Sequence, residues 1–518
     1  MKTSRSWITP DSAPHRSLVR LAQMKALFYR SFFLTMAACS GSSQLVPPPQ
    51  APLAERTAES THGPALPKEL GAWVDAYVGG IGKGLGEDYA PSGMLLVAQG
   101  GRPVVIRSFG KANRATGAVA DIDTQFRIAS VTKQFTSIAI AQLVEKHRLQ
   151  YTDPISKYLP NIPPAWNAIT IHQLLTHTSG IADYLSQKDF DAIGSESRTH
   201  DQVIASVSPL PLEFTPGERY SYSNTNYFLL GMIIEKVSGE SYEAYLQKNI
   251  FAPAGMTRSG TIESPSQTNV AIGYSVDVDD KPIVAPAINM SLQFADGGMH
   301  STMRDFLAWD RALAGTTLAS ERAKEQMFTA DKDGHAYGWV RREVEGTAVF
   351  EQYGVQDGFN SFITRVPARE LLVVALSNSE LFSAANLADS ARRMALTGVP
   401  IAPPTETRIV PTDVARVRAL AGDYVLTPEC EKGSASKLPK AFLDSIRDLK
   451  ISEERGHMKI KPIGQGVVHM FQKADGSFVA PKLRHLTVQV DAPSGALVLT
   501  QGDHLVLQYI RMPIPPTK

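Results

Sequence analysis

Ser130 and Lys133 have the residue types and the spacing of a nucleophile and its base. A serine hydroxyl reacts poorly until a neighbouring group takes its proton, and a lysine three residues later lies on the same face of a helix. The same S-x-x-K spacing also occurs at Ser108 and at Ser434. Only Ser130 is followed by apolar residues at helical spacing, over residues 131–144, so it alone is predicted to open a buried helix. Serine is also a favoured N-cap, so the pattern by itself equally fits a capping serine and a surface lysine.

Tyr222 and Asn224 favour the catalytic interpretation, because they form the only Y-x-N among the chain's 16 tyrosines and precede a helix-like apolar run. A phenol beside a lysine ammonium can be held as phenolate, take the serine proton and later protonate the leaving group. We expect Asn224 to hold Lys133 and a substrate amide. The structural alternative is a tyrosine packed in a loop and an asparagine that caps the next helix.

With these two motifs the chain resembles a known family, the penicillin-recognising serine hydrolases related to class C β-lactamases, D-Ala-D-Ala carboxypeptidases, D-aminopeptidases and esterases. The resemblance extends from about residue 70 to residue 398. Further matching runs follow in the family's order, at residues 126–129, 153–160, 171–180, 216–218 and 297–302. The resemblance implies an acyl-enzyme at Ser130 that is released to water, with no metal and no organic cofactor.

The third element of the family departs from its pattern. Relatives carry K-T-G or H-x-G on an edge strand, followed a few residues later by Gly-Phe. Aligning on residues 358–359 places Gln352, Tyr353 and Gly354 there, as candidate substrate-binding residues. Glutamine brings no cation, so recognition of the carboxylate of a β-lactam or a D-Ala terminus loses an electrostatic contribution.

The same strand is expected to complete the oxyanion hole. The resemblance implies that the backbone N–H groups of Val355 and Ser130 form it. Arg341, Arg342 or Arg365 could supply the missing cation, but each is interpreted as a solvated strand charge.

Other kinds of site are disfavoured by the sequence. There is no G-x-S-x-G nucleophile elbow and no H-E-x-x-H metal motif, and His172 and His177 are interpreted as structural. The glycines at 82, 84 and 86 are followed by Glu-Asp and are expected to form a loop rather than a nucleotide-binding turn. With 52 basic and 51 acidic residues, a formal charge of +1 and no basic cluster, nucleic acid is not an expected partner.

The N-terminal region resembles a bacterial export signal. From Met24 a basic segment and a short apolar run lead to small residues and Cys39, the layout of a lipoprotein signal in which the cysteine is lipidated. We therefore expect residues 1–39 to be an extension plus signal and residues 40–66 a flexible tether. The expected location is the bacterial cell envelope, in the periplasm, with membrane attachment through a lipid on Cys39. Plain secretion and an uncleaved anchor stay open, because Met36 departs from the usual aliphatic residue.

The rest of the chain is predicted to form two units. Residues 67–399 should be an α+β hydrolase of the β-lactamase/transpeptidase type, with an antiparallel sheet flanked by helices and a helical lobe inserted between early and late strands. A linker at 400–410 and a small β-barrel or β-sandwich at 411–518 should follow, since residues 485–490, 496–500 and 505–510 have strand character.

The predicted function is an exported serine hydrolase acting on an ester, an amide or a D-amino-acid peptide bond. Its substrate would be a small molecule or a peptide, and a monomer is expected. The alternative is a peptidoglycan-associated or β-lactam-sensing penicillin-binding lipoprotein with little turnover, for which Gln352 is the one favourable feature.

Overall fold

The computed structural model describes most of the chain from residue 69 to residue 512. The described ranges are 69–85, 90–186, 197–261, 269–276, 281–286, 289–403, 410–433, 435, 443, 446–454, 456–462, 468–480, 486–491, 496–501 and 505–512. The signal and tether predicted at 1–66, Cys39 included, therefore lie outside the described residues. No described helix combines the length and the apolar character that crossing a membrane requires.

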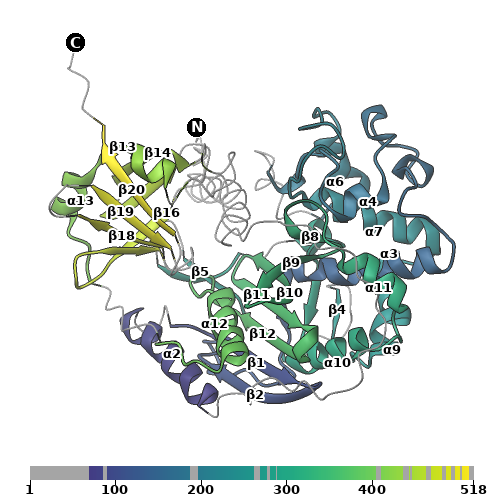
Figure 1. The fold of residues 1–518 in the computed structure, drawn as a ribbon, viewed down its shortest axis with the longest axis horizontal. Helices are drawn as coiled ribbons and strands as arrows, with labels where there is room; N and C mark the ends of the chain where they lie inside the picture. Colours follow the sequence, from purple (N-terminus) through teal and green to yellow (C-terminus); the bar gives the residue numbers. More distant parts are fainter. Residues whose placement is uncertain are drawn as a thin grey trace, which may run out of the picture.

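A seven-stranded antiparallel sheet forms the centre of the first unit (Figure 1). Its strands, in spatial order, are β2 (Arg102–Phe109), β1 (Gly93–Gln99), β12 (Leu371–Ser377), β11 (Phe359–Val366), β10 (Thr347–Gln356), β9 (Trp339–Val344) and β8 (His335–Ala336). The pairing of β1 with β12 aligns Gly93 with Ser377. This confirms the prediction that early and late strands pair across a long sequence separation.

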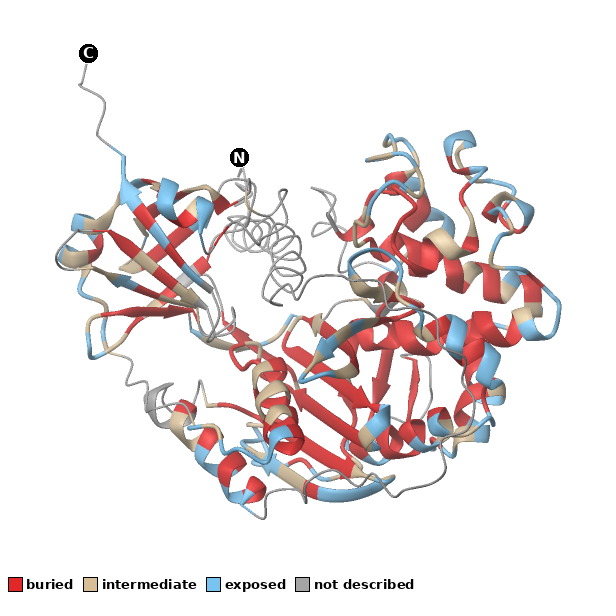
Figure 2. Ribbon diagram, viewed as in Figure 1, coloured by how far each residue is buried: buried red, intermediate tan, exposed pale blue. Residues whose placement is uncertain are grey.

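The inner strands β1, β12, β11 and β10 are largely buried, whereas the outer strands β2 and β9 are partly exposed, as the colours of Figure 2 show. Along β1, Met94 and Leu96 belong to one hydrophobic cluster, whereas Leu95 and Val97 belong to the cluster on the other face. Successive strand residues point to opposite faces, so a run of apolar residues needs cover on both sides. Helices α2 (Leu70–Leu85) and α12 (Ala384–Thr397) contribute to the second cluster. Gly82 and Gly84 lie in α2, so the predicted loop is wrong at these two glycines, whereas Gly86 lies outside the described residues.

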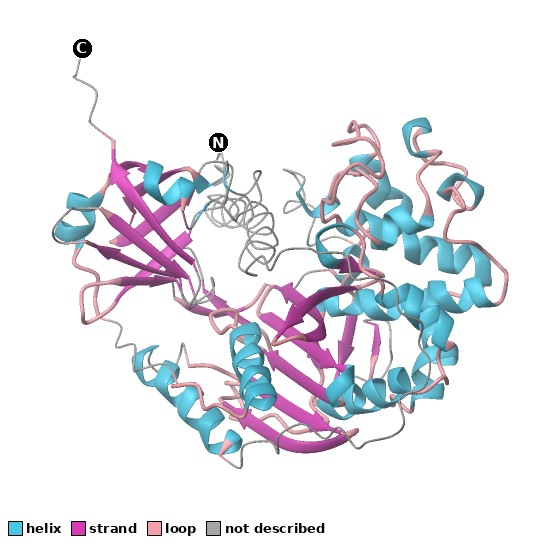
Figure 3. Cartoon of the chain, viewed as in Figure 1, coloured by secondary structure: helices cyan, strands magenta, loops and turns pink. Residues whose placement is uncertain are grey.

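The other face carries the helical lobe (Figure 3). Its central helix is α3 (Lys133–Glu145), in which Lys133 and every residue up to Leu143 are buried, as the all-round apolar segment predicted. The remaining helices of the described unit are α4 (Ile171–Leu175), α6 (His200–Val207), α7 (Asn224–Ser238), α8 (Tyr242–Leu246), α9 (Ala252–Ala254), α10 (Met303–Ala314) and α11 (Glu321–Phe328).

Two smaller sheets complete this unit. One has the order β3 (Phe126–Arg127), β7 (Met299–Ser301), β4 (Gly260–Thr261), and the other pairs β5 (Tyr274–Val276) with β6 (Pro282–Val284). Strand β3 ends three residues before Ser130, so the first of these sheets sets the position of the nucleophile.

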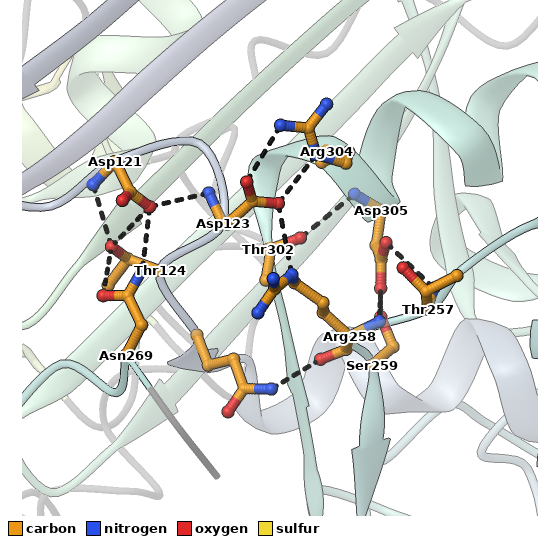
Figure 4. Close-up of polar contacts among 11 residues, drawn as sticks. Asp121, Asp123, Thr124, Thr257, Arg258, Ser259, Asn269, Thr302, Arg304 and Asp305 are labelled. Atoms are coloured by element: carbon orange, nitrogen blue, oxygen red, sulfur yellow. Dashed lines mark hydrogen bonds and ion pairs between the residues drawn. The ribbon is translucent and has the colours of Figure 1, made fainter. Parts of the chain in front are cut away.

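A polar network ties the segments around β3, β4 and β7 together (Figure 4). Asp123 accepts two hydrogen bonds from Arg304, at 2.7 and 2.9 Å, and lies 3.4 Å from Arg258. Asp305 accepts from the backbone N–H groups of Thr257 and Arg258, at 3.2 and 2.8 Å. Carboxylates shared between segments in this way fix the relative positions of the three strands, and β3 then leads into the site.

The second unit is a closed antiparallel barrel, so the predicted all-β domain is confirmed. Its strands are β13 (Gly422–Leu426), β14 (Asp448–Glu454), β15 (His457–Pro462), β16 (Val468–Gln472), β17 (Phe478–Ala480), β18 (Leu486–Val490), β19 (Leu497–Gln501) and β20 (Leu505–Arg511). The pairing of Val425 with Ile510 closes the barrel, which leaves no free sheet edge. Helices α13 (Val414–Leu420) and α14 (Pro428–Lys432) accompany it. The predicted linker at 400–410 is described only at 400–403 and 410.

Candidate active site

Ser130 lies in a tight turn between β3 and α3. A 3₁₀ helix, η2, spans Ala129–Thr132, and α3 begins at Lys133, so Ser130 does not open the α-helix as the sequence predicted. In a 3₁₀ turn residues three apart are eclipsed, which brings the two side chains closer than an α-helix would. Ala129 adopts a φ of +46°, a region that residues with a Cβ rarely occupy and that is enriched at functional sites.

The Ser130 hydroxyl contacts both predicted partners. Its Oγ lies 3.0 Å from Lys133 Nζ, and the Tyr222 hydroxyl donates to it at 2.8 Å. Lys133 Nζ also donates to Asn224 Oδ1 at 2.8 Å and to the backbone oxygen of Asp296 at 2.7 Å. The four residues predicted from the two motifs are therefore brought together.

Of the two groups that contact Ser130 Oγ, Lys133 has the proton that is easier to remove. Its side chain is buried, and burial lowers the pKa of the amine to about 8, although the carboxylates of Asp296 and Asp183 oppose that shift. A neutral amine has two N–H donors and one lone pair. With the donors on Asn224 Oδ1 and Asp296 O, the lone pair faces Ser130 Oγ, which is the arrangement that a general base requires.

Tyr222 is a neutral phenol in this arrangement. Burial raises its pKa well above the usual value, and the hydrogen bond with Ser130 only partly opposes this. This direction contradicts the prediction that Lys133 holds Tyr222 as phenolate, because burial favours the neutral phenol. The ring is held by stacking on His177, with centroids 4.4 Å apart. Tyr222 is thus placed to donate a proton rather than to take the first one.

Asn224 is oriented by a carboxylate. It is the first residue of α7, and the N-cap position belongs to Ser223, so Asn224 is not the helix cap that the alternative explanation required. Asp183 accepts from the Asn224 backbone N–H at 3.2 Å and from its Nδ2 at 3.1 Å. With Nδ2 on Asp183, the amide oxygen must point to Lys133. Burial raises the pKa of Asp183 to about 6.

Asp183 and Asp296 are functional candidates that the sequence analysis missed. Their positions in the sequence could have indicated them. Asp183 lies three residues after the family-like run 171–180, and Asp296 lies directly before the run 297–302. Burial raises the pKa of Asp296 to about 7, against the opposing effect of Lys133. Two acidic groups that titrate near neutral pH beside a lysine of pKa about 8 are characteristic of an active site.

The two histidines have structural contacts, as expected. His177 Nδ1 accepts from the backbone N–H of Ser223 at 3.2 Å, and burial lowers its pKa well below the usual value, so it stays neutral. His172 Nδ1 lies 2.8 Å from the Tyr337 hydroxyl. Among the described residues, no group of three or more His, Cys, Asp or Glu side chains could hold a metal ion.

Strand β10 runs beside the nucleophile, and its residues Gln352 and Gly354 contact the segment that carries Ser130. Gln352 is buried, and its Nε2 donates to the backbone oxygen of Ser130 at 3.3 Å. At Gly354 the backbones approach so closely that a Cβ would lie 2.2 Å from Ile128 O and 3.1 Å from Ser130 N. This contact places the strand where the family places its third element. The role of the Val355 N–H in an oxyanion hole stays a prediction.

Tyr353 does not face Ser130. Its ring belongs to the hydrophobic cluster on the opposite side of the sheet, and Val355 packs against the same cluster. This follows from the two-residue alternation of a strand, which puts 352 and 354 on one face and 353 and 355 on the other. The assignment of the Tyr353 side chain to substrate binding is therefore wrong, and Val355 can contribute only through its backbone.

None of the three arginines on the neighbouring strands takes the place of the missing cation. Arg365 is buried and ion-paired with Asp310 at 2.6 Å, so its interpretation as a solvated charge is wrong. Arg342 pairs with Glu351 at 3.1 Å. Arg341 is 47% exposed and lies 4.0 Å from Glu343, as a solvated strand charge should.

Comparisons with known proteins agree with this geometry. The Beta-lactamase family model matches residues 74–396. PbpX of Bacillus subtilis (strain 168) is 32% identical over 288 residues, which cover 55% of this chain and 70% of that protein. A penicillin-binding protein of the same organism is 30% identical over 317 residues, covering 57% and 70%.

Solved structures show the same fold. A penicillin-binding protein from Bacillus halodurans has a TM-score of 0.54 at 30% identity, covering 60% of this chain and 97% of that one. An octameric penicillin-binding protein homologue from Pyrococcus abyssi has a TM-score of 0.57 at 23% identity, covering 85% and 99%. The second match shows only the fold, but it extends over a larger share of this chain. The chain belongs to the Beta-lactamase family and is a serine hydrolase of the penicillin-binding-protein-like kind.

Proposed function

We propose that this chain is an exported serine hydrolase that forms an acyl-enzyme at Ser130 and acts on neutral esters and amides, D-amino-acid amides among them. The observation that carries the proposal is the position of Ser130 Oγ, 3.0 Å from Lys133 Nζ and 2.8 Å from the Tyr222 hydroxyl. Separate groups thus contact the hydroxyl, so one can take its proton while the other supplies a proton to the leaving group.

The reaction begins with a neutral Lys133. Its lone pair takes the Ser130 proton as Oγ attacks the substrate carbonyl carbon, and the carbonyl electron pair moves to oxygen. Backbone N–H groups of Ser130 and Val355 stabilise that oxyanion. Tyr222 donates a proton to the leaving group and regains a proton from Lys133. Water then attacks the acyl-enzyme through the same proton transfers and releases the acyl group from Ser130. Positioned acid–base groups of this kind contribute about 10² to 10⁴ in rate.

The substrate class follows from Gln352. Its amide is neutral and hydrogen-bonds to the backbone oxygens of Ser130 and Tyr353, both at 3.3 Å. A hydrogen bond to a charged group contributes about 1.5–3 kcal/mol, compared with about 0.5–1.5 for a neutral one. A substrate that carries a carboxylate is therefore bound about tenfold to a hundredfold more weakly here than in a site whose strand supplies a cation. A neutral substrate has no such loss of affinity.

The test combines labelling with turnover. The purified chain is incubated with a fluorophosphonate and a fluorescent penicillin, and the adduct is located by mass spectrometry, while p-nitrophenyl acetate and nitrocefin report turnover. We expect an adduct on Ser130 that disappears in Ser130→Ala and persists in the matched control Ser108→Ala. An adduct that survives Ser130→Ala rejects the nucleophile.

Gln352→Lys tests the substrate class. It should raise nitrocefin hydrolysis relative to ester hydrolysis by about tenfold to a hundredfold. A wild-type chain that already prefers nitrocefin, with a ratio that the substitution leaves unchanged, contradicts the role of Gln352. A stoichiometric burst without turnover on every substrate would instead support the slow penicillin-binding lipoprotein.

A further inference from the structure

Asp296 is a buried residue whose backbone contacts the proposed base and whose carboxylate acts on it electrostatically. It is 1% exposed, and its backbone oxygen accepts from Lys133 Nζ at 2.7 Å. Its Oδ2 lies 2.9 Å from the Tyr184 hydroxyl, whereas Oδ1 has no hydrogen-bond partner among the described residues. A buried carboxylate oxygen without a partner is rare, because desolvation of that oxygen costs free energy.

The hydroxyl of Tyr184 shows how Asp296 can change its protonation. That hydroxyl has one proton but contacts two oxygens, Asp296 Oδ2 and the backbone oxygen of Leu292. Since the Leu292 oxygen can only accept, both contacts are hydrogen bonds only when Asp296 carries a proton and donates it to Tyr184. When Asp296 is ionised, the two acceptors compete for one donor. Either form is accessible, in agreement with a pKa that burial raises to about 7.

The reaction creates a positive charge beside this carboxylate. When Lys133 takes the serine proton it becomes an ammonium in a buried position, where an isolated charge is costly. The titratable groups that face it from the surrounding segments are Tyr222, Tyr227, His177, Asp183 and Asp296. The phenols and the imidazole are neutral, so among these five described groups the two carboxylates are the ones that can offset the ammonium.

We propose that Asp296 is a positioning residue for acylation, whose carboxylate stabilises the ammonium that forms on Lys133 as Ser130 gives up its proton. This inference rests on the proposed function. In the step, the Ser130 O–H bond breaks, its proton bonds to the Nζ lone pair, and the oxygen electron pair forms the bond to the substrate carbonyl carbon. Asp296 takes no part in bond making. It acts as the carboxylate behind the base of a serine triad acts, by stabilising the protonated base.

Asp296→Asn separates this role from a structural one. The substitution keeps the backbone oxygen that Lys133 uses, and the Asn Oδ1 can still accept from Tyr184, so only the charge is removed. The maximum of kcat/KM for p-nitrophenyl acetate at high pH should fall about tenfold to a hundredfold, the size expected for the loss of one partly screened charge. The midpoint of the rising limb of the pH profile should move to lower pH, because a carboxylate favours the ammonium. The melting temperature should not fall.

Asp310→Asn is the matched control. It also removes a buried carboxylate, but one that pairs with Arg365, so it should lower the melting temperature and leave the pH midpoint in place. Tyr184→Phe is a second variant in case Asp296→Asn does not fold. It removes the donor that stabilises the Asp296 carboxylate, so the midpoint should shift in the same direction by a smaller amount.

A midpoint in Asp296→Asn that equals that of the wild type, or moves to higher pH, overturns the inference. So does an unmoved midpoint in Tyr184→Phe, if only that variant folds. Failure of the proposed function is recognised separately, because the wild-type chain then gives no adduct on Ser130. An adduct on wild-type Ser130 with unchanged pH profiles in both variants rejects the role of Asp296 alone.

Discussion

A single methyl group added at Gly354 should disable the site. The Cβ of Gly354→Ala would lie 2.2 Å from Ile128 O and 2.5 Å from Ser361 Oγ. Both are held in place, since Ser361 Oγ donates to Ile128 O at 2.7 Å. Contact with a backbone oxygen cannot be relieved by side-chain rotation, so β10 or the segment before Ser130 must move by about 1 Å, which costs about 1–3 kcal/mol of stability.

The same displacement moves the groups that stabilise the oxyanion. The added Cβ would also lie 3.1 Å from Ser130 N, one of the two proposed oxyanion donors. A misplacement of about 1 Å reduces catalysis by about a hundredfold. We therefore expect Gly354→Ala to lower kcat/KM for p-nitrophenyl acetate and the rate of fluorophosphonate labelling by at least that factor.

The matched control is Gly79→Ala in α2. A Cβ there meets no atom within 4 Å, so the change should stabilise the chain by about 0.5–1 kcal/mol, as alanine in place of glycine does within a helix, and leave labelling unchanged. Thermal denaturation and labelling rates are measured on both variants and on the wild type. Labelling of Gly354→Ala within threefold of wild type would refute the argument that β10 is pressed against the nucleophile.

Other predictions address the proton transfers and the anchor. Lys133→Ala and Tyr222→Phe should each lower turnover by about two to four orders of magnitude, and the double variant should lose little more, because the two groups serve one hydroxyl; additive losses would contradict this. The wild-type kcat/KM should rise with pH through about 8 as Lys133 loses its proton, and a rate that is flat between pH 6 and 9 would argue against Lys133 as the base. If Cys39 is lipidated, the wild type should be recovered from membranes with an added lipid mass and Cys39→Ala should be released; equal membrane recovery of both without lipid mass rejects a lipid anchor.

The fold and the reacting groups could be predicted from the sequence because short stretches of neighbouring residues indicate them. Residues 131–144 are apolar at helical spacing, which predicted the buried helix after Ser130. Tyr222 lies two residues before α7, and Asn224 is its first residue, where the apolar run after them predicted a helix. Strand-like runs near the C-terminus predicted a small β-barrel or β-sandwich, and β18, β19 and β20 of the closed barrel occupy those runs.

The orientation of residues on β10 could have been predicted but was not. Alternation along a strand puts Gln352 and Tyr353 on opposite faces whatever the register, so both side chains could not have faced the nucleophile. By contrast, the ion pair of Arg365 with Asp310 joins residues from β11 and α10, and no local pattern indicates it. The same holds for Asp183, whose contact with Asn224 spans 41 positions along the chain.

The protonation states depend on burial, which is a property of the fold rather than of residue type. Burial favours the neutral form of every ionisable group, so it lowers the pKa of Lys133 towards neutrality and raises that of Tyr222 away from it. Residue types alone suggested an ammonium on Lys133 beside a phenolate on Tyr222. Such a charge pair is disfavoured here because both groups are buried. Of the two groups on the Ser130 hydroxyl, Lys133 is the one whose pKa burial brings to about 8, which supports our proposal that Lys133 is the first acceptor and that Tyr222 donates to the leaving group.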